Sequence, residues 1–323
     1  MRTMSRHSSL LLGLTALALI GAPATASAAG EPTVSTGVVT EITPNSSTLN
    51  ALVNPQGAAT NYSFDVGLTK SYGLVTPTVP VGAGTTAVKV KASALGLTPA
   101  STYHYRIVAR NGRGTTRGID RTFTTKKQPF ALVLGANPNP VAVGSGTVLN
   151  GTLSGTGNAG QAVILQQNPF PYTQGFLNVG NPLVTDTAGN FAFPVISIGS
   201  TTQYRVVLAS KPEVATPVVT VGAAVRITSA ASRTRVRRGN KVNFHGAVRP
   251  TGPGSAISIQ KLSSTGRWVR VAGTYTRRGG KSYSTYSKSV KIGRGGTYRV
   301  HVAVATGTFV GSDSPTVRIS TFR

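Results

Sequence analysis

Three stretches of the chain repeat one pattern: they read TYHYRIVA at residues 102–109, QYRVVLA at residues 203–209 and TYRVHVA at residues 297–303. In the third stretch Tyr298, Val300 and Val302 alternate with the polar Arg299 and His301. Because successive side chains of a β-strand point to opposite faces, this alternation predicts a strand that is buried on one face and solvated on the other. The chain therefore contains three copies of one strand-based unit.

The spacing of these copies indicates the size of each unit. The leading tyrosines, Tyr103, Tyr204 and Tyr298, are 101 and 94 residues apart, which matches the ~100 residues of an immunoglobulin-like sandwich. Between them, short runs rich in Val, Ile, Thr and Tyr alternate with Gly, Pro and Asn turns, and helical periodicity is missing. We predict an all-β fold of tandem sandwiches, with short linkers at residues 126–129 and 221–223. The predicted modules span residues 32–125, 130–221 and 223–319.

The first module carries a family resemblance in three stretches, LNALVNPQG at residues 49–57, YSFDVG at residues 62–67 and LTPASTY at residues 97–103. These stretches resemble the bacterial fibronectin type III domain. The resemblance places Tyr103 at the tyrosine corner of that family, where the ring is buried and its hydroxyl bonds to the backbone just upstream. The fold class is then one of tandem immunoglobulin-like and fibronectin type III β-sandwiches.

The second and third modules match each other. Residues 144–151 correspond to residues 239–246, and residues 162–167 correspond to residues 256–261. A hairpin at residues 185–191 aligns with residues 276–283 if one extra residue is allowed. Both modules resemble generic bacterial immunoglobulin-like modules.

The first 28 residues are typical of a secretory signal peptide. Arg2 and Arg6 precede an apolar run at residues 10–20, and Ala26-Ser27-Ala28 fits the A-x-A cleavage pattern. The apolar run is shorter than the ~20 residues that a membrane-spanning helix needs. We therefore expect a secreted, extracellular protein that begins near Ala29 and is released from the membrane or retained at the cell surface.

The composition is poor in the residue types that usually act in catalysis. The chain has seven Asp and Glu residues and no Cys, which excludes disulfides, thiolate metal sites and Cys nucleophiles. Residues 155–160 spell G-x-G-x-x-G, but a strand-type run follows where a dinucleotide site needs a helix. His104, His245 and His301 are expected to be isolated surface residues. We expect no catalytic residue, no metal and no cofactor, and a protein that is not an enzyme.

Positive charge is concentrated in the third module. Residues 222–323 hold 19 basic residues and one acidic residue, whereas residues 129–221 hold two of each. Such a surface attracts polyanions through long-range attraction and counterion release, and an exported protein meets anionic cell-wall polymers or acidic polysaccharides. We do not expect specific nucleic-acid recognition, because no base-stacking pattern is visible. The alternative is that the charges only prevent edge-to-edge pairing of strands. The candidate polyanion-binding residues are Arg233, Arg235, Arg237, Arg238, Lys241, Arg277, Arg278 and Lys281.

A second candidate site is the loop NPFPYTQGF at residues 168–176. Its aromatic residues Phe170, Tyr172 and Phe176 would stack on neutral glycans or grip another secreted protein; the alternative is that they cover their own module or a domain junction. We therefore expect a secreted, non-catalytic scaffold or adhesion protein whose third module is held on an anionic surface. The alternative function is that of an accessory carbohydrate-binding protein in a secreted polysaccharide-degrading system.

Overall fold

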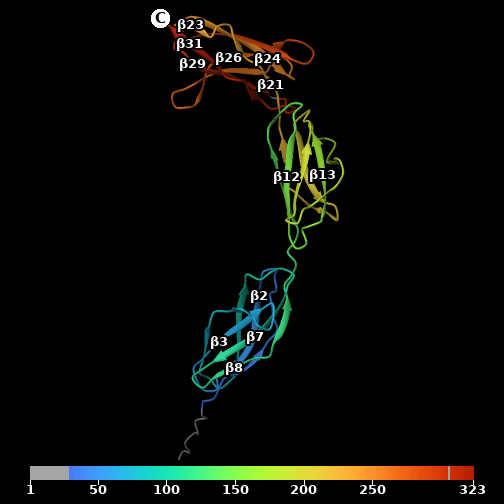
Figure 1. Ribbon diagram of the computed structural model, residues 1–323, viewed down its shortest axis with the longest axis vertical. Helices are drawn as coiled ribbons and strands as arrows, with labels where there is room; N and C mark the ends of the chain where they lie inside the picture. The colour runs from blue at the N-terminus through green and yellow to red at the C-terminus, as the bar shows by residue number, and fades with distance from the viewer. Residues whose placement is uncertain (1–28, 305) are drawn as a thin grey trace, which may run out of the picture. The chain divides into compact units, whose positions relative to one another are not determined.

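The computed structural model describes residues 29–304 and 306–323, so the predicted signal peptide at residues 1–28 lies outside the described residues. The described residues form β-strands joined by turns, and no helix occurs among them (Figure 1). The chain divides into two compact units, and the boundary along the sequence lies between Lys126 and Lys127.

The first unit is a sandwich of two antiparallel sheets. One sheet consists of β1 (Thr33–Thr36), β2 (Ser46–Asn54) and β6 (Val88–Leu95) in that order. The other pairs β3 (Thr60–Gly67) with β7 (Thr102–Arg110), with β4 (Leu74–Val75) and β5 (Val79–Gly82) beside β3, and β8 (Thr115–Arg117) and β9 (Arg121–Thr124) beside β7. Alternate residues of β2 and β7 are buried between the sheets, and Leu49, Phe64 and Ile107 have no exposed surface.

The second unit begins with another sandwich of the same kind. Its first sheet is β10 (Ala131–Asn137), β12 (Thr147–Ser154) and β16 (Asn190–Val195) in that order. Its second sheet pairs β13 (Ala162–Pro169) with β17 (Thr202–Leu208), with β14 (Leu177–Asn178) and β15 (Leu183–Val184) beside β13, and β18 (Lys211–Ala215) and β19 (Val219–Val221) beside β17. Leu149, Val163 and Val206 lie fully buried in its core.

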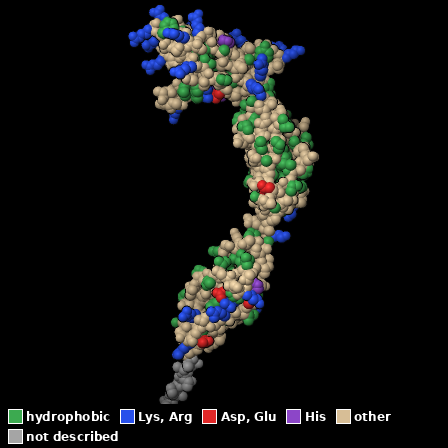
Figure 2. Space-filling view, in the orientation of Figure 1, with side chains coloured by type: hydrophobic (Ala, Val, Ile, Leu, Met, Phe, Trp, Pro, Cys, Tyr) green, Lys and Arg blue, Asp and Glu red, His purple; other side chains and the backbone are tan. Residues whose placement is uncertain are grey.

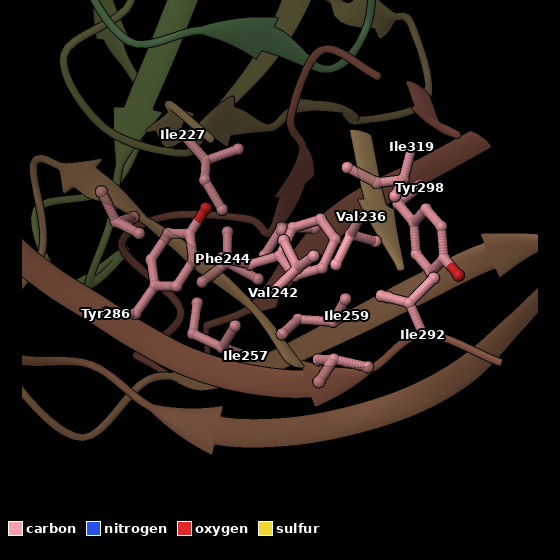
Figure 3. Close-up of a cluster of buried hydrophobic side chains, with 14 of the residues drawn as sticks. Ile227, Val236, Val242, Phe244, Ile257, Ile259, Tyr286, Ile292, Tyr298 and Ile319 are labelled. Carbon is pink, nitrogen blue, oxygen red and sulfur yellow. The ribbon is translucent and has the colours of Figure 1, made fainter. Parts of the chain in front are cut away.

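The C-terminal sandwich completes the second unit. One sheet has β21 (Arg226–Ile227) and β22 (Ala230–Ala231) beside β24 (Lys241–Arg249), followed by β28 (Ser284–Lys291) and β27 (Arg277–Arg278). The other has the order β23 (Arg235–Arg237), β31 (Val317–Phe322), β29 (Gly296–Ala303), β25 (Ala256–Leu262) and β26 (Trp268–Tyr275), with β30 (Ser312–Asp313) beside β29. Alternation on β24 buries Val242, Phe244 and Val248 and exposes Lys241 and His245. Figure 3 shows the side chains of both sheets meeting in this core.

All three sandwiches share one strand order. In each module one strand (β2, β12 or β24) lies between an earlier strand (β1, β10 or β21) and a later strand (β6, β16 or β28). Two other strands (β3 and β7, β13 and β17, β25 and β29) pair at the centre of the opposite sheet. This is the arrangement of immunoglobulin-like and fibronectin type III sandwiches. The predicted fold class is therefore confirmed.

The cross-strand register corrects the alignment of the repeats. An arginine of the second central strand faces an acceptor on the first in every module, the pairs being Arg106–Asp65, Arg205–Gln166 and Arg299–Gln260. Tyr105, rather than Tyr103, is therefore the counterpart of Tyr204 and Tyr298. The alignment on Tyr103 was wrong by two residues. Because a shift of two keeps every side chain on the same face of a strand, the alternation alone does not reveal it.

Two glycines explain the match between the second and third modules. Gly151 pairs with Phe191 across β12 and β16, and Gly246 pairs with Tyr286 across β24 and β28. In both cases the aromatic side chain of the partner occupies the space where a glycine Cβ would lie. The glycines are required because any side chain there would collide with the ring or its hydroxyl and with a neighbouring backbone carbonyl.

The segment expected as the second linker is part of the folded unit. β11 (Val141–Ala142) pairs in parallel with β20 (Ala223–Ala224), and Ala224 also forms a bridge with Val310. The side chain of Phe309 packs against the cores of both the second and the third module. Residues 221–225 are buried, so these two modules are joined by strand pairing and a shared apolar side chain.

Candidate anion-binding surface of the C-terminal module

All eight predicted polyanion-binding residues are exposed, but the structure places them in two groups. Arg233, Arg235, Arg237, Arg238 and Lys241 lie on or beside β23 and at the start of β24. Arg277 and Arg278 form β27, and Lys281 lies in the turn that follows. β23 and β27 are edge strands of the two different sheets. In Figure 2, Lys and Arg side chains project from the C-terminal module, whereas the visible face of the middle module carries almost none.

Strand alternation directs the β23 arginines outward. Val236 is 2% exposed and packs in the core, so Arg235 and Arg237 on either side of it point to solvent. The guanidinium of Arg235 lies 5.5 Å from the centre of the Phe322 ring, and the backbone N–H of Arg238 donates to the carbonyl of Phe322. The edge strand is thus anchored through its backbone while its charges remain accessible.

The charges of this module have almost no internal counter-charge. Asp313 is the single acidic residue of residues 222–323. It is engaged by Arg299, at 2.6 Å, and by Nδ1 of His301, at 2.8 Å. Within the described residues, none of the eight candidate cations forms an ion pair with an Asp or Glu side chain. Their charges therefore act outward, on whatever lies in the solvent.

The aromatic loop is largely engaged with its surroundings. Phe170 and Tyr172 contact one another edge to face, with ring centres 5.5 Å apart, and the Phe170 ring lies beside Gly307 of the third module. The guanidinium of Arg205 lies 4.3 Å from the centre of the Phe176 ring. The structure does not bring the three rings together into one open platform. Each of them is only partly exposed.

The Arg205–Phe176 contact belongs to a set that recurs in every module and was not predicted from the sequence. The arginines aligned by the register lie over a ring from the neighbouring hairpin, at 4.3 to 4.4 Å, the pairs being Arg106–Tyr72, Arg205–Phe176 and Arg299–Trp268. Such cation–π contacts hold the side chains in place. A signal for them exists in the Tyr-Arg dipeptide that each module carries.

Two of the histidines that were expected to be isolated lie beside an aspartate, His104 at Asp120 and His301 at Asp313. His104 Nδ1 lies 2.8 Å from Asp120, which also accepts a bond from the Tyr72 hydroxyl. Burial acts to raise the pKa of Asp120, but the hydrogen bonds from His104 and Tyr72 outweigh it and lower that pKa. No group of three or more His, Asp or Glu side chains able to hold a metal occurs in the part of the chain that the structure describes.

Tyr103 lies inside the first module. Its side chain is 4% exposed, its ring stacks on Phe123, and its hydroxyl accepts a 2.8 Å hydrogen bond from the backbone N–H of Thr98. The bond ties the turn before β7 to the core, because Thr98 lies five residues upstream of the ring.

Comparisons with known proteins found neither a matching family model nor a matching curated protein. Solved structures that were matched include a tetra-tandem repeat from the extending region of a large adhesion protein, at 15% identity and a TM-score of 0.29, over 90% of this chain and 74% of that chain. Domains FN1–FN3 of chicken CNTN1 match at 15% identity with a TM-score of 0.30, over 91% of this chain and all of that one. Titin domains match over the same shares at 15% identity with a TM-score of 0.37. Because these TM-scores are all below 0.5, the fold class rests on the strand order of the three sandwiches.

In the part of the chain that the structure describes, no helix is long and apolar enough to cross a membrane.

Proposed function

We propose that this chain is a secreted, non-catalytic scaffold or adhesion protein whose C-terminal module attaches it to anionic extracellular polymers. The proposal rests on one observation: eight exposed cations in that module lack an acidic side-chain partner among the described residues. The middle module has no net charge, so a polyanion is attracted to the C-terminal module first.

The mechanism is release of condensed counterions. Each Lys or Arg that neutralises a charge on a linear polyanion frees a counterion from it, so binding falls as salt rises. Exposed charges also attract over about 8 Å at physiological ionic strength. The two groups of cations, at edges of opposite sheets, allow the module to contact a polymer on more than one side.

The test measures retention of residues 29–323 on immobilised heparin as NaCl is raised. The whole secreted chain is used because the pairing of β11 with β20 crosses the boundary between the second and third modules. In the test variant Arg233, Arg235, Arg237 and Arg238 become Gln. If all four contact the polymer, the slope of log K against log salt flattens by about 3.

A control variant distinguishes the effect of where the four charges lie from the effect of a lower net charge. Arg113, Arg117, Lys126 and Lys127 of the first unit and the linker are also exposed, and replacing them with Gln removes the same four charges. We expect this control to keep the slope of the unmodified chain. Equal flattening in both variants, or no retention of the unmodified chain at low salt, contradicts the proposal.

A further inference from the structure

A groove of about 660 Å³ crosses the outer face of the sheet that contains β24, β28 and β27. Ala247 on β24, Thr285 on β28 and Arg277 on β27 form one row across it, because Ala247 pairs with Thr285 and Thr285 pairs with Arg277. His245 and Ser287 form the neighbouring row, about 7 Å further along the strands. The short side chain of Ala247 lies at the bottom of the groove, and the longer side chains of His245 and Arg277 flank it.

Three polar side chains of this groove have no hydrogen-bond partner among the described residues. The hydroxyl of Ser287 bonds to Asn243, whereas the Arg277 guanidinium, the His245 imidazole and the Thr285 hydroxyl form no side-chain hydrogen bond there. Arg277 and His245 are exposed and Thr285 is half-buried. Together they offer a planar cation, a ring nitrogen and a hydroxyl over two strand spacings, about 10 Å.

The second module has a groove at the same place, of about 720 Å³, lined by Asn150, Gly151 and Asp186. The residue before Asp186 and the residue before Arg277 are both buried threonines. Thr185 exchanges two hydrogen bonds with the backbone of Gln161 and donates a third to Asn158. Thr276 makes the same set with Ser255 and Gly252, although its third bond is longer. Asp186 and Arg277 are therefore equivalent positions with opposite charge.

The charge at this position sets what each groove accepts. Backbone N–H groups, that of Asn190 first, donate to Asp186 and lower its pKa, so the second groove holds a carboxylate that repels an anion. In the third module the guanidinium of Arg277 presents the planar pair of donors that matches a carboxylate.

We propose that the groove at Arg277, His245 and Thr285 binds one carboxylate-bearing sugar unit of a linear acidic polysaccharide, a polyuronate. Arg277 receives the carboxylate, and Thr285 and His245 bond to ring hydroxyls. Charge alone would favour any polyanion, but a hydroxyl and an imidazole beside a single guanidinium fit a sugar acid better than a polyphosphate. This inference rests on the proposed function and names the ligand class of the same module.

The experiment measures binding of a galacturonate trimer to residues 29–323 by calorimetry. The trimer carries few charges, so it reports on one groove. Arg277→Asp, which copies the residue of the second module, is expected to weaken binding about tenfold or more because it removes a charge-assisted contact and adds repulsion. The matched control is Arg318→Asp, which makes the same charge change at an exposed strand residue of the same module, on β31 of the opposite sheet, outside the groove and outside the eight candidate cations. It is expected to leave the affinity within about twofold. Thr285→Val should weaken binding without any change in net charge.

Two results overturn the inference while leaving the proposed function intact, provided that heparin retention remains. One is equal weakening by Arg277→Asp and Arg318→Asp. The other is displacement of the trimer by polyphosphate of the same charge as effectively as by galacturonate oligomers. If the unmodified chain is not retained on heparin, the proposed function is wrong as well. Circular dichroism of each variant verifies that the fold is retained.

Discussion

Replacement of Gly246 by Ala should destabilise the C-terminal module strongly. A Cβ at this position would collide with the carbonyl oxygen of Thr228 and would lie 2.8 Å from the hydroxyl of Tyr286. The Tyr286 hydroxyl donates a 2.8 Å hydrogen bond to that same carbonyl. The added methyl group therefore meets a backbone atom, which cannot swing aside as a flexible side chain can, and a buried hydrogen bond.

The expected cost follows from these two collisions. Overpacking of a tight core costs about 1–3 kcal/mol, and loss of the Tyr286–Thr228 hydrogen bond adds about 1 kcal/mol. The free energy of unfolding of the module should fall by about 2–4 kcal/mol, a large share of the ~5–15 kcal/mol typical of a domain. Urea denaturation of residues 29–323, followed by the fluorescence of Trp268, measures it as a shift of midpoint at constant slope.

The matched control is Gly293→Ala. Gly293 has nothing within 4 Å of its ideal Cβ and no left-handed backbone angle, so this substitution should be neutral or stabilise by up to about 1 kcal/mol through the unfolded chain. If Gly246→Ala changes stability by less than about 0.5 kcal/mol, the range of ordinary surface substitutions, the steric argument for the glycine is refuted.

Three further predictions concern single side chains. Tyr103→Phe should cost the first unit about 1 kcal/mol, the net value of its hydrogen bond from Thr98; unchanged denaturation of that unit would contradict it. Burial raises the pKa of Tyr286 to about 12 from 10.0, so its contribution to stability is complete below pH 10 and is lost as the pH rises toward 12, by about 2–3 kcal/mol. The decline of unfolding free energy over that window should be shallower in Tyr286→Phe than in the unmodified chain. Phe309→Ala should weaken the second and third modules together, because its side chain packs on both cores; calorimetry that shows only one of them melting earlier would oppose this.

The sandwich architecture could be predicted because it depends on a local property. Alternation along residues 297–303 follows from the two-sided geometry of a strand, and three copies at similar intervals indicate three sandwiches. The exposure of the eight candidate cations could also be predicted from the sequence, since charged side chains in strands of this kind face water.

Other features depended on which strands became neighbours. The pairing of Arg106 with Asp65, and hence the equivalence of Tyr105 with Tyr204, requires the register between two strands about 40 residues apart. Gly222 and Ala223 resemble a linker because they are small, yet the missing side chain of Gly222 also leaves room for Pro140 and Val310, next to the pairing of β20 with β11. A linker and a packed junction between two strands therefore give the same sequence pattern.

By itself, the sequence determined the fold class, the repeats and the placement of charge, because each is carried by residues close together in the chain. Only the tertiary structure decided that Arg277 faces His245 and Thr285 across one groove, and that Asp186 holds the same place in the second module. The physical reason is that a binding surface on a sheet is assembled by hydrogen bonding between strands that are distant in sequence. The alternation within each strand says which face a residue takes, but not which side chain stands beside it.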